Sequence, residues 1–212
     1  MRLLILTTLV VATYAGLADK IEKKSIPKPA PRTCYGDVNA LNPTGRKKGG
    51  VAASNRMIQA DLASLTKYRE CFQKVADKFC IQASILGAIA SRESRGGALL
   101  YKTKGFGDKG NAWGIMQCDI RYSGLNCTSV PWNSCAHIEM MTGQLIIPFM
   151  KQVKKKHQKW PAAKQLQGGV AAYNFGVKNV KSWAGLDSGS TGNDYSNDVI
   201  ARAKWLHLKK WN

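Results

Sequence analysis

The sequence predicts an α+β fold that is mainly helical and contains one small β-sheet. Several stretches repeat apolar residues three or four positions apart, which is the spacing of an amphipathic helix. Between two of these stretches, residues 106–117 are rich in glycine and aromatic residues and have the composition of short strands joined by turns. The chain has 212 residues and shows no internal repeat, so we expect a single domain with a sizeable core.

The first predicted helical region begins near Ser54, an acceptable N-cap residue, and continues to about Phe79. Its apolar residues would lie on one side of a single helix, or of two helices separated by a short break. We therefore expect this region to be structural. The apolar residues are Ile58, Leu62, Leu65, Phe72, Val75 and Phe79.

The next predicted helix, about residues 83–92, is apolar nearly all round and is therefore expected at the centre of the domain. Ile85, Ile89 and Glu93 follow one another at intervals of four, so the Glu93 side chain should point towards the core. A carboxyl group at the edge of an apolar face loses hydration in its charged form, so its pKa rises. A raised pKa suits a general acid. The alternative is an exposed glutamate at a helix end, paired with a neighbouring arginine.

Three further helices are expected after a loop over residues 120–136. The first contains Pro148, which should kink it, and ends in the lysine run 154–156, where cations suit a helix C-terminus. The second runs from Trp160-Pro161 through Ala172, and the third covers about residues 194–208. The buried stripe of the first consists of Ile138, Met141, Leu145, Phe149 and Val153.

Two aspartates follow Glu93 on turn-prone backbone. Asp108 lies in Gly-Asp-Lys-Gly-Asn, which has the composition of a turn. Asp119 closes the segment 113–117, Trp-Gly-Ile-Met-Gln, which is predicted to be a short strand. Neither aspartate is a specific signal when taken alone.

Three motifs in a fixed order are more specific than any one residue. They are Glu-Ser-Arg-x-Gly from Glu93, Gly-x-Gly-Asp-x-Gly-Asn-x-x-Gly-x-Met-Gln-x-Asp from Gly105, and Ala-Tyr-Asn-Phe-Gly from Ala172. This set resembles the goose-type lysozymes and, more distantly, the catalytic domain of lytic transglycosylases. The resemblance extends from about Arg32 to Val199. It implies one lysozyme-like domain with a cleft between a helical body and a small sheet.

The resemblance also implies a reaction and a catalytic set. The reaction is hydrolysis, with inversion, of the β-1,4 bond between N-acetylmuramic acid and N-acetylglucosamine in peptidoglycan. Glu93 would protonate the departing oxygen, while Asp108 and Asp119 would position and activate a water molecule. No metal or other cofactor is expected.

The sugar-binding residues expected from the resemblance carry aromatic, amide and imidazole groups. An aromatic face packs on pyranose C–H groups, and an amide hydrogen-bonds a hydroxyl or an acetamido group. Taken as a lone motif, Tyr173 would instead be a core aromatic, and for His137 a structural role and a ligand role are equally open. The expected set is Gln117, His137, Tyr173, Asn174 and Tyr195.

The N-terminus predicts export. Residues 1–18 have a basic start, a short apolar run and small residues at a cleavage point, which indicate a signal peptide. An uncleaved membrane anchor is the alternative, but the run is shorter than the roughly 20 residues of a spanning helix. Residues 19–31 form a Lys/Pro-rich tail, and residues 32–212 are the predicted catalytic domain of a secreted, extracellular protein.

The formal net charge of +19 predicts an anionic partner. An exported chain with no nucleic-acid-binding motif points to bacterial surfaces and their peptidoglycan as partners, and not to nucleic acid. For any single lysine, solubility remains the simpler explanation. We expect a monomer that does not insert stably into membranes.

Six cysteines in an exported chain predict three disulfides. A zinc site is disfavoured because no Cys-x-x-Cys spacing occurs and the histidines are not paired with the cysteines. The family resemblance implies a bond between Cys34 and Cys80. For the other four, Cys127 and Cys135 could close a short loop, which would leave Cys71 to pair with Cys118.

Two functional alternatives stay open at this level. A lytic transglycosylase would use the glutamate but would not need water-holding aspartates. A non-catalytic cationic protein would permeabilise membranes through charge and would gain nothing from Glu93. Antibacterial defence and digestion are both compatible with a secreted muramidase.

Overall fold

The structure is a computed structural model that describes residues 33–211. The predicted signal peptide, the Lys/Pro-rich tail, and the first and last residues of the predicted domain lie outside the described residues. The predicted fold class is confirmed, because the described chain is mainly helical and has one small antiparallel sheet. The main helices are α1 Gly50–Thr66, α2 Arg69–Phe79, α3 Ala83–Ser94, α4 Cys135–Met141, α5 Ile147–Lys156, α6 Ala162–Phe175 and α7 Tyr195–Leu208.

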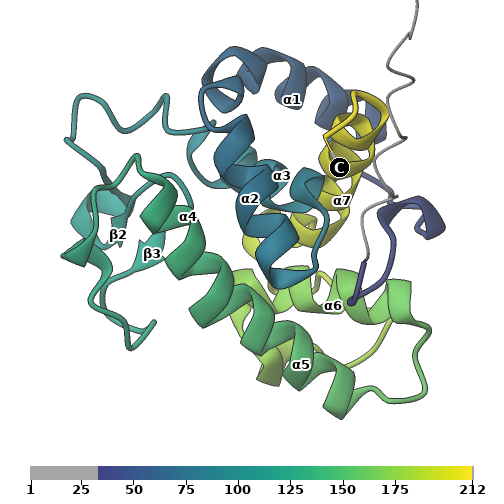
Figure 1. Ribbon diagram of the computed structural model, residues 1–212. Coiled ribbons are helices and arrows are strands. Elements are labelled where there is room, and N and C mark those ends of the chain that lie inside the picture. The colour runs from purple at the N-terminus through teal and green to yellow at the C-terminus, as the bar shows by residue number, and fades with distance from the viewer. Residues whose placement is uncertain (1–32, 212) are drawn as a thin grey trace, which may run out of the picture.

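Helix α3 lies at the centre of the molecule, with α1, α2 and α7 packed around it (Figure 1). Every residue from 83 to 91 is buried. The sequence explains this position, because a helix without charged residues until Arg92 can be covered on all sides without burying an unpaired charge. The end of α3 is therefore held in place from several directions.

The first helical region consists of two helices, separated at Lys67 and Tyr68. The predicted start at Ser54 is wrong, because α1 begins four residues earlier. Gly49, with φ of 91°, forms the left-handed turn that precedes α1. Ser54 is instead buried inside the helix, where its hydroxyl accepts the Arg46 N–H at 3.1 Å.

The sheet has three very short antiparallel strands in the order β1-β2-β3, with bounds β1 Phe106–Gly107, β2 Ala112–Trp113 and β3 Cys118–Asp119. The predicted strand over residues 113–117 is wrong beyond its first residue. Gly114 and Gln117 have positive φ values, so the backbone turns between β2 and β3. Asp119 therefore ends β3 and pairs with Ala112 of β2.

The predicted kink near Pro148 takes the form of a π-helical segment, Thr142–Ile146, which joins α4 to α5. Proline has no N–H to donate, and its ring interferes with the preceding helical turn, so a wider turn before it relieves both problems. Pro161 precedes α6 as its N-cap, and α6 continues three residues beyond the expected Ala172. Helix α7 covers the predicted range to within one residue.

In the part of the chain that the structure describes, no helix combines the length and the apolar character of a transmembrane span.

Three disulfides join the six cysteines, and the Cys34–Cys80 pair is confirmed. The other two predicted pairs are wrong, because the bonds are Cys71–Cys135 and Cys118–Cys127. Cys135 begins α4, which packs against α2 and its Cys71. The loop after Asp119 returns Cys127 to the end of the sheet, where it meets Cys118. Cys127 thus does form a short-range bond, but with the cysteine before it in the chain and not with Cys135.

The pairing predicts unequal effects on stability. Replacing Cys71 and Cys135 together by serine should lower the free energy of unfolding by roughly 2–4 kcal/mol, because a long loop is released in the unfolded chain. Replacing Cys118 and Cys127 should cost less, since that bond closes a sequence separation of 9 against 64. Chemical denaturation measures both losses. A peptide map that links Cys127 to Cys135 would contradict the pairing itself.

Candidate active site

One cleft collects the three predicted catalytic carboxylates. A hollow of about 760 Å³ is lined by Glu93 from α3, by Asp108 and Asp119 from the sheet region, and by the end of α6. A neighbouring hollow of about 380 Å³ shares Glu93, Asp108 and Gln117 with it. The two hollows therefore adjoin at Glu93 and together are longer than either one alone. An extended ligand suits such an elongated space better than a small compact one.

Glu93 is the last but one residue of α3, which ends where Arg95 adopts a left-handed conformation with φ of 58°. Its carboxyl group is half-buried, and the buried Tyr195 hydroxyl donates a hydrogen bond to Oε1. Burial raises the pKa of Glu93 to about 7, although the Tyr195 hydrogen bond and the Arg92 charge both oppose the rise. The group therefore retains a proton close to neutral pH.

Arg92, next to Glu93, is held by two carboxylates at the start of α7. It forms an ion pair with Asp198, and its Nη2 lies 2.9 Å from Asp194 Oδ1. The same guanidinium also donates to the Thr191 carbonyl at 3.0 Å. Because Arg92 is fixed by these contacts, the backbone that carries Glu93 is fixed against α7 as well.

The contacts of Arg92 belong to a larger buried network that joins α1, α3 and α7. Arg202 Nη2 lies 2.8 Å from Asp198 Oδ2, and Arg202 Nη1 donates to Ser91 Oγ at 2.8 Å. Ser91 in turn donates to Asp61 of α1 at 2.7 Å. Arg202, Ser91, Asp61 and Asp198 are each about 99–100% buried. Each buried charge thus has partners, which satisfies the condition for keeping charges in a core.

Asp119 has an environment opposite to that of Glu93. Its Oδ1 accepts the backbone N–H groups of Arg121 at 2.8 Å and Tyr122 at 3.1 Å, and its Oδ2 lies 3.2 Å from Arg121 Nη2. Burial alone would raise the pKa of Asp119, but these hydrogen bonds outweigh it and hold the pKa below its ordinary value. Arg121 Nη2 also lies 3.4 Å from Asp108 Oδ2. One guanidinium thus stands between the two aspartates.

Gln117, Tyr173 and Asn174 of the expected sugar-binding set line the cleft. Gln117 lies so close to β1 that a Cβ on Gly107 would be 1.8 Å from its Oε1, so any side chain at Gly107 would displace the Gln117 amide. The Tyr173 hydroxyl donates to the Met116 carbonyl. Asn174 fixes the neighbouring part of the cleft wall, because its Oδ1 accepts the Thr191 N–H at 2.8 Å.

The other two expected sugar-binding residues do not line the cleft. Tyr195 is 99% buried behind Glu93, and its hydroxyl serves that carboxyl group. His137 is fully buried beneath the turn after β2, where Nε2 accepts the Met116 N–H at 3.3 Å. Burial lowers the pKa of His137 to about 4, so the ring is neutral and able to accept. Of the two roles left open for His137, this position supports the structural one.

Sequence reasoning missed Arg121 and the buried network. Arg121 stands two residues after Asp119, the spacing at which an aspartate accepts a nearby backbone N–H, so a local signal was present. The network has no such signal, because Asp61, Arg92 and Arg202 meet only after folding. Among residues 33–211, no group of three or more His, Cys, Asp or Glu side chains is arranged to hold a metal ion.

A mainly helical body with α3 at its centre, a small three-stranded sheet and a cleft between them define a lysozyme-like α+β fold. Comparison with known families agrees with this class and narrows it. The sequence profile of the family described as Lysozyme g matches residues 35–210. The chain belongs to this family.

Individual relatives support the same assignment. The chain is 39% identical over 183 residues to Lysozyme g of Gallus gallus, covering 82% of this chain and 84% of that protein. It is 38% identical over 182 residues to Lysozyme g of Struthio camelus, covering 81% and 86%. It is 47% identical over 191 residues to the "Glycine, glutamate and proline-rich protein" of Lottia gigantea. That match covers 84% of this chain but 46% of the relative, so the chain spans about half of that protein's length.

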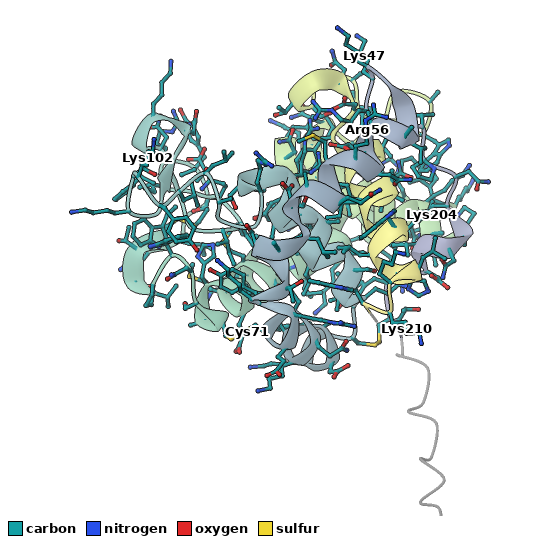
Figure 2. All side chains as sticks on the ribbon, turned by 90° about the horizontal axis from the view of Figure 1, so that it is seen from above. Lys47, Arg56, Cys71, Lys102, Lys204 and Lys210 are labelled. Carbon is teal, nitrogen blue, oxygen red and sulfur yellow. A yellow bond between two sulfur atoms is a disulfide. The ribbon has the colours of Figure 1, made fainter. Side chains whose placement is uncertain are left out.

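The contacts of Asp119 predict the effect of removing Arg121. In Arg121→Gln the pKa of Asp119 should rise towards its ordinary value, because the carboxylate loses a charged donor but keeps burial. Titration of the Asp119 carboxyl carbon by NMR measures the shift. Lys102→Gln removes the same charge from an exposed residue that precedes β1 (Figure 2). It should leave the pKa of Asp119 unchanged. If the pKa of Asp119 does not shift in Arg121→Gln, the two backbone N–H groups are the cause of its low value instead.

Proposed function

We propose that the protein is a secreted lysozyme that hydrolyses the β-1,4 bond between N-acetylmuramic acid and N-acetylglucosamine in bacterial peptidoglycan. The observation that carries this proposal is the half-buried Glu93 carboxyl, with its pKa raised to about 7, facing a cleft shared with two aspartates. Relatives named Lysozyme g, similar over about four fifths of this chain, support it. The proposed role is antibacterial defence, digestion or both.

Glu93 is the proposed general acid. A glycosidic oxygen leaves as a sugar hydroxyl only if it gains a proton, so the donor must still hold one at the working pH. Burial keeps Glu93 protonated up to about pH 7, and Tyr195 directs the carboxyl group from behind. Activity should therefore fall as the pH rises through about 7, when the acid loses its proton.

Asp108 and Asp119 are the proposed water-holding groups. A base must be ionised, and the lowered pKa of Asp119 keeps it ionised where Glu93 is still protonated. Activity should fall on the acid side only when the pH drops through the lowered pKa of Asp119. Arg121 bridges the two aspartates, so it would fix their positions relative to an attacking water molecule. A water that these groups activate on the face of the sugar opposite the acid would give inversion.

The cleft wall supports a sugar ligand. Tyr173 presents an aromatic ring beside Glu93, and Gln117 and Asn174 bring amide groups to the same hollow. Such residues contact the C–H faces and the acetamido groups of amino sugars. No cofactor is part of the proposal. The three disulfides suit an oxidising, extracellular location, and bacterial wall is the proposed partner of the monomer.

The decisive variant is Glu93→Gln, which nearly preserves shape but removes the acidic proton. We expect clearing of bacterial wall suspensions to fall by at least about a hundredfold, in keeping with the usual contribution of a general acid, while wall binding persists. Glu70→Gln changes an exposed glutamate of α2 in the same way and is the matched control. If Glu93→Gln clears walls like the wild type, Glu93 is not the acid. Killing of cells without wall hydrolysis would favour the cationic alternative.

The products separate the hydrolase from the transglycosylase. A transglycosylase uses the substrate's own hydroxyl and forms an anhydro sugar, whereas the proposed enzyme gives reducing muramic acid ends of α configuration. Asp119→Asn and Asp108→Asn should each slow the reaction, and the double variant should be slowest. Mass spectrometry identifies the ends, and NMR at early times identifies the anomer. Anhydro products, or a retained β anomer, would rule out the roles given to these aspartates.

A further inference from the structure

A third hollow, of about 470 Å³, lies where the start of α1 meets the segment before α7. Figure 2 shows Lys47 and Arg56 close together on the helical part of the molecule, far from Lys102, which precedes the sheet. We call it the basic pocket, because four of its lining residues are cationic. The four cations are Arg46, Lys47, Lys48 and Arg56, and the lining also includes Gly192 and Asp194.

The positive charge of the basic pocket is not balanced within the described chain. Within residues 33–211, no carboxylate forms an ion pair with the side chains of its four cationic residues. Asp194 lines the pocket, but its two oxygens are occupied by Arg92 at 2.9 Å and by the Lys47 backbone N–H at 2.7 Å. Four like charges around one hollow repel one another, and an anion in the hollow would relieve the repulsion.

The loop that carries these charges is held in a fixed shape. The Thr44 N–H donates to Asn197 Oδ1 at 2.9 Å, and the Arg46 N–H donates to Ser54 Oγ at 3.1 Å. Gly45 packs so tightly on the start of α1 that a Cβ there would lie 2.4 Å from the Gly50 carbonyl carbon. A loop fixed before binding loses little conformational entropy when a ligand arrives.

The basic pocket adjoins the catalytic cleft. Thr191 lines the cleft, and the next residue, Gly192, lines the pocket. Asn174 of the cleft wall holds this segment through its two hydrogen bonds with Thr191, at 2.8 and 3.1 Å. The two hollows therefore meet at this segment, and a wall fragment that extends past it would reach both.

We propose that the basic pocket is a phosphate-binding exosite, which holds phosphodiester-linked anionic polymers of the bacterial wall while the cleft acts on the attached glycan. Arginine guanidinium groups match phosphate oxygens in pairs, and lysine supplies point charges. The hollow is larger than one phosphate group, and its cations extend along a loop and a helix turn, which suits a chain with one charge per repeat. Holding the polymer raises the local concentration of glycan at the cleft. This inference rests on the proposed function.

The test uses Lys47→Gln/Arg56→Gln, two exposed residues that lie outside the catalytic cleft. The control pair, Lys151→Gln/Lys210→Gln, makes the same charge change on exposed residues of α5 and of the chain end after α7. Calorimetry at low salt measures binding of poly(glycerol phosphate), with poly-glutamate as the carboxylate probe. Kinetics compare walls that carry phosphate polymers with walls stripped of them.

The pocket variant should bind poly(glycerol phosphate) roughly tenfold more weakly than the wild type, while the control pair changes little. Its KM should rise on phosphate-bearing walls alone, with kcat unchanged. If the pocket variant and the control pair lose the same affinity for poly(glycerol phosphate), the effect depends on total charge alone. That result would overturn the exosite. Equal losses on poly-glutamate and on stripped walls would assign the pocket to peptide carboxylates and overturn the phosphate ligand. If the wild type cuts no walls, the proposed function fails, and the calorimetry still decides the exosite.

Discussion

The buried ion-pair network that joins α1, α3 and α7 is the constraint on which the candidate active site depends. Removing charges from water is costly, and a buried arginine without partners would be strongly destabilising. Here Arg92 and Arg202 share Asp198, and the network continues through Ser91 to Asp61 of α1. As a result, the network fixes α1, α3 and α7 relative to one another at the point where α3 ends. Glu93 follows Arg92 directly, so its direction into the cleft is set by the partners of its neighbour. The first residue of α7, Tyr195, then completes the site from behind.

The pKa values of Glu93 and Asp119 are shifted in opposite directions by their different surroundings in the cleft. Burial dominates at Glu93 and raises its pKa, whereas donors from Arg121 and Tyr122 dominate at Asp119 and lower its pKa. The raised value has a consequence for folding. Between about pH 4.5 and 7 the folded protein keeps a proton on Glu93 that the unfolded chain releases, so this residue lowers stability as the pH rises through that window. The opposite sign holds for Asp119, whose lowered pKa contributes stability that is lost as the pH falls. The raised pKa of the proposed acid therefore costs the folded protein some stability above about pH 4.5.

The sequence was informative where structure is local and uninformative where it is not. The apolar run before Glu93 predicted a central helix and an inward-facing carboxyl, since both follow from a spacing of four along one helix. The resemblance to goose-type lysozymes implied that Asp108 and Asp119 would share a cleft with Glu93, and they line it. The pairing of Cys71 with Cys135 depends on how α4 packs on α2, which no local pattern encodes. The burial of His137 and Tyr195 likewise depends on what folds over them. The contact between Arg121 and Asp119 could have been predicted, because the two residues are only two positions apart in the sequence.

The central claim is that the fold raises the pKa of Glu93 enough to make it a proton donor near neutral pH. NMR titration of the Glu93 side-chain carboxyl carbon, assigned through Glu93→Gln, measures this directly and does not depend on substrate or activity. The expected pKa is about 7. The Tyr195→Phe variant should titrate higher still, because the lost hydrogen bond favours the ionised form. A wild-type Glu93 that titrates near the ordinary value of 4.5 would contradict the claim.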